Sequence, residues 1–217
     1  MAFITASVTG SVSQLELPGG CVTQNSLANG AVGRSQLAQV AGASFHLPME
    51  GWRVHDSTAV LPTTAAADDL GLSAGTYGTN SPSLLSIDFK ASSTAAYARR
   101  VVQLPPVYDA GQTVQIDIRG GMITTIADTH CFTDVELCKL DGDGAVGSDL
   151  VTTTGSLSAT SINSLTKATT SFAVNSTTLS AGDLLDMRVV VHGLDASTGT
   201  VVKAQISTIE MLLDIRG

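Results

Sequence analysis

One serine of the sequence stands in the pattern of a hydrolase nucleophile. Gly71-Leu72-Ser73-Ala74-Gly75 matches G-x-S-x-G, in which a sharp turn between a strand and a helix exposes the serine. Here a stretch of alanines and aspartates precedes the motif, and the turn-forming residues 76–82 follow it. Neither flank has the required pattern, so we expect a loop without catalytic activity.

A short acidic segment looks like the start of a calcium-binding loop. Asp141-Gly142-Asp143-Gly144 has the opening spacing of an EF-hand, but that loop needs an oxygen ligand fifth, Gly sixth and Glu twelfth. The chain offers alanine, valine and threonine at those positions. We therefore expect a hairpin turn. An irregular calcium site made by Asp141, Asp143 and Asp149 is the alternative.

The histidines show no spacing that predicts a metal site. They stand at His46, His55, His130 and His192, without i, i+2 or i, i+4 pairs. A metal site would have to assemble in space, for example on the three-fold axis of a trimer. No nucleophile is paired with a base, and no two carboxylates are suitably spaced. We therefore expect a protein without metal, cofactor or enzymatic activity.

The composition excludes several classes of partner. The 217 residues carry a net charge of −8, and the 11 basic residues are scattered apart from Arg99-Arg100. Nucleic-acid binding needs clustered Lys and Arg, so we expect no nucleic-acid partner. Apolar runs fall short of the ~20 residues of a membrane span, so we expect no membrane partner. Charged residues are only 14% of the chain, and such a surface favours association with partner subunits.

The start of the chain and its cysteines indicate a cytosolic protein. Residues 1–10 lack the basic and long apolar regions of a signal peptide. The cysteines are odd in number and lack the C-x-x-C spacing of zinc sites. We expect three reduced thiols, at Cys21, Cys131 and Cys138.

The first forty residues contain a ten-residue repeat of the form G-x-V-x-x-x-x-L-x-x. One Val and one Leu per unit cannot form a core of their own, so they must be buried against another chain. We therefore predict an extended N-terminal arm over residues 1–42, with a disordered leader as the alternative. The glycines of the repeat are Gly10, Gly20 and Gly30, and the predicted binding residues of the arm are Val12, Leu17, Val22, Leu27, Val32 and Leu37.

From residue 43 to 217 the apolar pattern changes to period two, which is typical of half-buried strands. Besides the alternating segments, which are given at the end of this paragraph, strands are plausible around 52–54, 96–104, 146–153 and 168–174. Together these segments make eight to ten strands. The pattern slips by one residue near Ser207-Thr208, which predicts a β-bulge in the last strand. This number of strands favours an all-β jelly-roll β-sandwich. The alternating segments are 85–89, 114–118, 135–137, 185–191 and 202–215.

The repeat resembles those of bacteriophage fibres and capsid decoration proteins, where decamers such as G-[ST]-V-T-x-x-x-L-A-[DN] recur in parallel trimers. The closest stretch is Asn25-Ser26-Leu27-Ala28-Asn29-Gly30-Ala31-Val32. Residues 104–112 and 179–185 also look like the turn-into-strand segments of jelly-roll fibre heads. The resemblance implies a homotrimer that is part of the virion, assembled in the host cytoplasm.

The leading hypothesis is therefore a capsid decoration or cement protein, whose arm clamps the major capsid protein and stabilises the phage shell. A tail fibre or spike with a receptor-binding jelly-roll head is one alternative. A carbohydrate-binding module is an alternative of another class. It needs exposed aromatic rings, and one Trp, three Tyr and five Phe are a thin supply once a core is formed.

Overall fold

The computed structural model describes residues 39–89, 93–123, 129–143, 145–153, 168–195 and 201–216. These residues belong to one compact unit and are almost entirely β-structure, with a single 3₁₀ turn, η3 (Met49–Gly51), within the described ranges. The strands are β1 (Gln39–His46), β2 (Gly71–Ser73), β3 (Ser83–Leu85), β4 (Ser93–Gln103), β5 (Val114–Met122), β6 (Thr129–Leu140), β7 (Val146–Asp149), β8 (Ala168–Ala173), β9 (Leu184–Asp195) and β10 (Ala204–Arg216).

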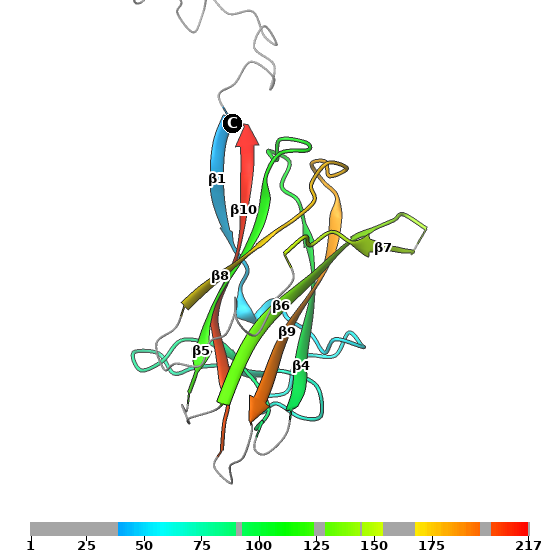
Figure 1. Ribbon diagram of the computed structural model, residues 1–217. Coiled ribbons are helices and arrows are strands. Elements are labelled where there is room, and N and C mark those ends of the chain that lie inside the picture. The colour runs from blue at the N-terminus through cyan, green and yellow to red at the C-terminus, as the bar shows by residue number, and fades with distance from the viewer. Residues whose placement is uncertain are drawn as a thin grey trace, which may run out of the picture. The chain divides into compact units, whose positions relative to one another are not determined.

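The strands form two antiparallel sheets, which confirms the predicted β-sandwich (Figure 1). The six-stranded sheet has the order β2-β3-β10-β5-β8, and β1 pairs with β10 as well. The four-stranded sheet has the order β4-β9-β6-β7. Neighbours in space are mostly distant in sequence, as expected of a two-sheet sandwich.

The alternating apolar residues of both sheets point inward, as their period predicts. In β5, Val114, Ile116 and Ile118 are buried, and in β9, Met187 and Val189 are buried. Their polar neighbours in sequence lie on the outward faces. The sandwich therefore has one apolar core and two polar outer faces.

The strand predicted over 85–89 is largely wrong, because the observed strand β3 covers Ser83–Leu85 and shares only Leu85 with it. The strand β3 ends at Leu85, although Ser86 N still donates to Ala204 O over 3.0 Å. Beyond it, side chains replace part of the ladder: Ser86 Oγ accepts from Ala204 N over 2.9 Å, and Asp88 Oδ1 accepts from Val202 N over 2.8 Å. Ser and Asp compete for backbone partners in this way, which ends a regular strand.

The bulge predicted in the last strand is confirmed. Along the β10–β5 ladder, Ile206 pairs with Gly120 and Thr208 with Arg119, so Ser207 is the extra residue. Ser207 and Thr208 are consequently both partly exposed, whereas Ile206 and Ile209 on either side are buried. The bulge thus presents two successive hydroxyl side chains on the outer face of the six-stranded sheet.

Two of the three cysteines lie among the described residues, and both are free thiols, as expected. Cys131 is buried, and burial raises the pKa of its thiol to about 12. Cys138 is partly exposed on the other face of β6, and burial first, then Asp149, raises its pKa. Cys21 lies outside the described residues.

Two further observations concern the expected absence of a membrane span and the predicted division of the chain at residue 42. Among the described residues, no helix is long and apolar enough to cross a membrane. The strand β1 begins at Gln39, inside the range predicted for the arm. Residues 1–38 of the predicted arm lie outside the described residues, so the division of the chain at residue 42 stays a prediction.

Candidate functional site

Most aromatic residues among the described ones lie in the core or pack against it, and the few that do not lie at the surface. Among the described residues, those buried in the core or packed against it are Trp52, Phe89, Tyr108, Phe172 and Phe45. Tyr77, Tyr97 and Phe132 remain. Tyr97 on β4 and Phe132 on β6 both lie on the outward face of the four-stranded sheet, because their sequence neighbours Ala96, Ala98, Cys131 and Thr133 are buried. We call this surface the β4–β9–β6 face.

The ring of Tyr97 contacts a guanidinium group and an imidazole ring. The Arg188 guanidinium carbon lies 5.1 Å from the centroid of the Tyr97 ring, within the range of a cation–π contact. The His55 ring centroid lies 4.7 Å from the Tyr97 centroid. His55 comes from the segment before β2, which pairs with the free edge of β4 through Arg53 and Arg99. These two contacts hold the Tyr97 ring in position.

Two arginine–carboxylate pairs lie beside Tyr97. Arg188 Nε donates to Glu136 Oε2 over 2.8 Å, and the Arg188 Nη2 group also contacts this oxygen. Arg99 binds Asp186 with two parallel bonds, Nε to Oδ1 at 2.7 Å and Nη2 to Oδ2 at 2.5 Å. The hydrogen bond to Asp186 raises the pKa of Arg99. Planar, paired groups of this kind keep their geometry and still have unused donors and acceptors at the surface.

A second aromatic pair lies one row further along the sheet. Phe132 on β6 and His192 on β9 are cross-strand partners, and their rings stack with centroids 4.5 Å apart and planes 13° apart. Burial lowers the pKa of His192, and the Asp134 carboxylate opposes this effect. The imidazole is therefore neutral at pH 7, which suits its contact with the Phe132 ring.

The lowered pKa of His192 predicts a pH-dependent loss of stability. In the unfolded chain the histidine titrates near pH 6.5, so below this pH the unfolded state binds the proton more readily than the folded state. The contribution is complete above about pH 6.5 and is lost as the pH falls through the lower folded value. Urea unfolding at pH 7.5 and 5.5 should therefore show a smaller loss for His192→Gln than for the wild type. Equal losses would contradict the prediction, because the variant lacks the titrating imidazole.

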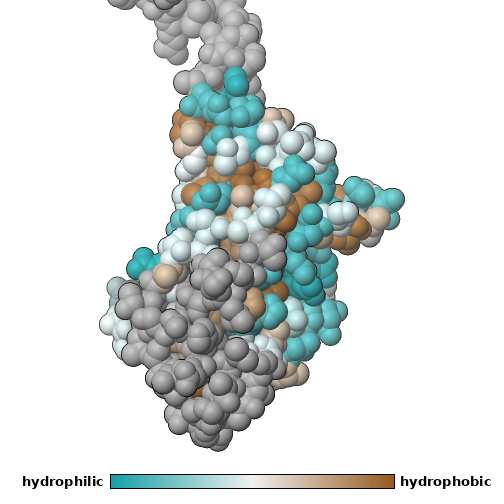
Figure 2. Space-filling model, viewed as in Figure 1, coloured by the Kyte–Doolittle hydropathy of each residue, from teal (hydrophilic) through white to brown (hydrophobic). Residues whose placement is uncertain are grey.

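A hollow of about 220 Å³ lies among the charged groups of this face. It is lined by both ion pairs, by His55, by Cys138 and by Val146 of the neighbouring strand β7. The Val146 residue is 53% exposed, and Figure 2 shows hydrophobic and hydrophilic residues side by side on the β7 hairpin. The face thus combines partly exposed rings with fixed donors and acceptors, an arrangement suited to a ligand that has both C–H surfaces and hydroxyl groups.

The serine motif is explained by packing. Ser73 ends the strand β2, and no helix follows it among the described residues 74–89. A Cβ at Gly71 would lie 2.3 Å from the Ala65 backbone nitrogen. The second glycine, Gly75, has φ +74°, and a Cβ there would lie 2.5 Å from the Asn80 carbonyl oxygen. Both glycines are therefore required by close backbone approach and turn geometry.

The acidic segment forms the expected hairpin turn between β6 and β7. Asp141 N donates to Ala145 O over 3.1 Å, and Asp143 Oδ1 accepts from Ala145 N over 2.9 Å. Asp149 Oδ1 accepts from the backbone nitrogens of Leu137 and Val151, over 2.9 and 3.0 Å. Two of the proposed calcium ligands therefore bind backbone groups. The structure does not bring Asp141, Asp143 and Asp149 together as a metal-binding group among the described residues.

One group of potential metal ligands was not predicted. His55 Nδ1 lies 3.0 Å from Asp69 Oδ1, and His55 Nε2 lies 3.7 Å from Asp68 Oδ2. These three residues have suitable atoms within 4.8 Å of one another. The two carboxylates also hold the imidazole against Tyr97, so the contacts have a structural role without an ion. Of the other histidines, His46 lies on the opposite sheet, and the side chain of His130 is outside the described part.

The predicted binding residues of the arm are untested. Val12, Leu17, Val22, Leu27, Val32 and Leu37 all lie outside the described residues. The residues that sequence reasoning missed are Tyr97, Phe132, His192 and the two ion pairs. The period-two pattern already placed Glu136 and Arg188 on an outward face, but it could not show that three separate strands bring these groups together.

Searches of family models and of curated proteins find no match. Solved structures give distant similarities. The CBM22-1 xylan-binding domain from Paenibacillus barcinonensis Xyn10C is 14% identical with a TM-score of 0.40, over 82% of this chain and 97% of that one. The C-terminal family 22 carbohydrate-binding module of Clostridium thermocellum Xyn10B is 16% identical with a TM-score of 0.36, over 79% and 92%. The xylan-binding module CBM15 is 11% identical with a TM-score of 0.41, over 81% and 99%.

These findings correct the leading hypothesis. Capsid decoration is wrong as the leading function, because the similar solved structures named above are carbohydrate-binding modules and none is a virion protein. At these TM-scores the similarity does not by itself assign a ligand to this chain. The homotrimer, the major capsid protein as partner and the virion location stay predictions that the described residues do not test.

Proposed function

We propose that the sandwich is a carbohydrate-binding module without catalytic activity, and that its ligand lies across the β4–β9–β6 face. The observation that carries the proposal is the gathering of Tyr97 and Phe132 beside two arginine–carboxylate pairs, since they are two of the three aromatic residues that lie outside the core in the described part of the chain. Sugars present C–H faces that pack on aromatic rings and hydroxyls that both donate and accept hydrogen bonds. The face offers partners for both.

The spacing of the rings sets a minimum length for the ligand. The strand β9 lies between the strands of Tyr97 and Phe132. Tyr97 pairs with Val190 and Phe132 with His192, so the two rings are also offset by two residues along the strands. Strand geometry places their Cα atoms about 12 Å apart. A ligand that touches both rings is therefore longer than a single sugar ring, and an oligosaccharide or polysaccharide fits better than a monosaccharide.

Arginine Arg188 should contribute most to the affinity, because it contacts the Tyr97 ring and its ion pair with Glu136 lies at the surface. Replacing Arg188 with glutamine removes a charged donor and the cation–π contact that orients the ring. We expect an affinity loss of about tenfold or more, since hydrogen bonds to charged groups are worth about 1.5–3 kcal/mol. The measurement is binding to a glycan array that includes xylohexaose, cellohexaose and maltohexaose, followed by calorimetric titration of the best ligand.

A matched control is available on the opposite sheet. Arg119 of β5 is exposed on the outer face of the six-stranded sheet, so Arg119→Gln makes the same chemical change away from the proposed site. We expect this variant to bind like the wild type. Equal effects of Arg188→Gln and Arg119→Gln, or a wild-type protein that retains no oligosaccharide of the array, would refute the proposed function. Thermal unfolding of both variants verifies that any loss of binding is not a loss of fold.

A further inference from the structure

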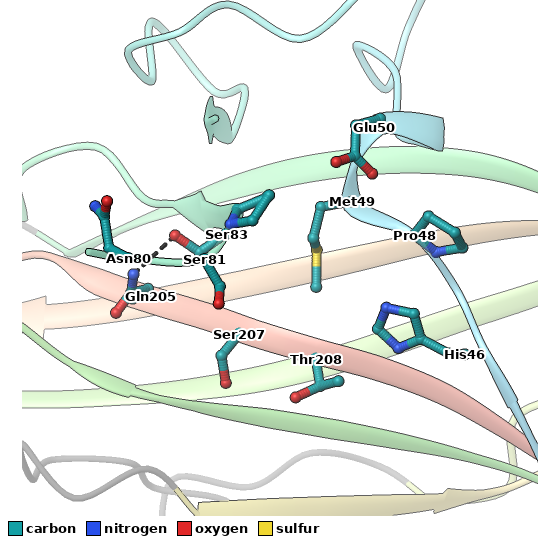
Figure 3. Close-up of a pocket in the computed structure, with 11 residues that line it drawn as sticks. His46, Pro48, Met49, Glu50, Asn80, Ser81, Ser83, Gln205, Ser207 and Thr208 are labelled. Carbon is teal, nitrogen blue, oxygen red and sulfur yellow. Dashed lines mark hydrogen bonds between the residues drawn. The ribbon is translucent and has the colours of Figure 1, made fainter. Parts of the chain in front are cut away.

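A larger groove lies on the other side of the sandwich, outside the proposed site. It has a volume of about 710 Å³ and lies against the outer face of the six-stranded sheet. Figure 3 shows that its walls come from β10, from the η3 turn and the end of β1, and from the segment that leads into β3. A groove of this size falls within the range of small-ligand sites.

The groove is lined mainly by neutral hydrogen-bonding side chains. Gln205 is held in place, because its Nε2 donates to the buried Ser83 Oγ over 2.7 Å. The Ser207 hydroxyl donates to Arg119 O over 3.1 Å, which leaves its lone pairs as acceptors. The amide and hydroxyl residues of the lining are Asn80, Ser81, Ser83, Gln205, Ser207 and Thr208.

The β-bulge of β10 is what places two hydroxyls at this groove. In a regular strand Ser207 and Thr208 would point to opposite faces, and one would enter the core. The bulge instead leaves both partly exposed, and both line the groove. Bulges often re-aim side chains beside binding sites. The function proposed above does not account for this bulge, because its two hydroxyls lie on the other sheet.

An exposed aromatic residue lies in a hollow that adjoins the groove. Tyr77 is fully exposed at the tip of the turn closed by the Thr76–Asn80 bridge. It lines an adjoining hollow of about 520 Å³, which shares Asn80, Ser81 and Pro82 with the groove. Sugars pack their C–H faces on aromatic rings and form hydrogen bonds through their hydroxyls. A ring beside amide and hydroxyl groups therefore offers both kinds of contact, as the β4–β9–β6 face does.

The charges of the groove decide what kind of sugar fits. Among its described lining residues there is no Lys or Arg, and Glu50 is a carboxylate. The ionisable side chains of the lining are Glu50 and His46, so a sulfated, phosphorylated or carboxylated ligand would find one like charge and no lysine or arginine to bind it. We propose that this groove is a second glycan-binding site, specific for neutral sugars, so that one chain binds glycan on both faces of the sandwich. Different residues carry this inference, so it does not depend on the β4–β9–β6 face.

The test weakens the first site and then asks whether the remaining binding depends on the groove. In the Arg188→Gln background, calorimetric titration with cellohexaose, maltohexaose and a sulfated hexasaccharide should show residual binding of a neutral hexasaccharide. Adding Gln205→Leu and Thr208→Val should lower this residual affinity about tenfold or more, because two hydrogen-bonding groups are lost. Adding Tyr77→Ala alone, which changes a fully exposed side chain, should weaken it severalfold without affecting the fold.

The matched control makes the same two changes at an exposed turn. Gln112→Leu with Thr113→Val lies before β5 and outside the groove, and should leave binding unchanged. The inference is overturned if no residual binding exists, if the groove substitutions do not reduce it, or if the sulfated hexasaccharide binds more tightly than the neutral ones. If Arg188→Gln binds like the wild type while the groove substitutions abolish binding, the groove is supported and the first site fails.

Discussion

Replacing Gly193 with alanine should lower the free energy of unfolding by about 1–3 kcal/mol, the usual cost of overpacking a core. Gly193 lies in β9, and a Cβ there would be 2.1 Å from Cγ and 2.2 Å from Cδ2 of Phe89. The Phe89 ring is fully buried, and its backbone nitrogen donates to Val202 O over 2.9 Å. The ring therefore cannot move aside without disturbing the core. Urea unfolding of both proteins measures the difference.

Two comparisons make this prediction specific. Gly142→Ala is the matched control, because a Cβ at Gly142 would meet nothing within 4 Å and the change should stay within about 0.5 kcal/mol. The second is a double-mutant cycle: in a Phe89→Leu background, Gly193→Ala should cost less than in the wild type, since the smaller side chain leaves room. An equal cost in both backgrounds would show that the clash with Phe89 is not the cause.

Replacing Trp52 with alanine should cost about 3–5 kcal/mol, the largest effect that we expect of a single substitution. Trp52 is fully buried and directly follows η3. The next residue, Arg53, pairs with Arg99 at the edge of β4 through backbone bonds of 2.8 and 3.0 Å. The Trp52 ring thus anchors the segment that carries His55 to Tyr97, so the variant should also bind oligosaccharide less tightly.

Trp52→Phe separates the packing of the ring from its polar group. The indole Nε1 is buried and has no hydrogen-bond partner among the described residues. Phenylalanine keeps much of the apolar contact and removes this unpaired donor, so it should cost far less than alanine. Urea unfolding of the two variants provides the comparison. If phenylalanine were as costly as alanine, the indole nitrogen would have to form a bond that stabilises the native state.

Features that depend on neighbours along the chain were predictable. The alternation in 114–118 and 185–191 predicted β5 and β9 with their buried faces, because successive side chains of a strand point to opposite sides. A single phase slip identified the bulge at Ser207. The acidic segment 141–144 was correctly expected to form a turn, because Gly and Asp favour turn geometry. In contrast, β1 and β2 were not predicted, since neither has a clear alternating pattern.

The fold class, the bulge and the polar outer faces were thus determined by the sequence alone, through local periodicity and turn residues. The tertiary structure alone decided the sites. Tyr97, Arg188 and Phe132 come from three strands, and only the β4-β9-β6 pairing places them on one face. The groove likewise needs β10 to pass beside η3 and the segment before β3. Strand order depends on contacts between residues far apart in the chain, and no local pattern encodes it.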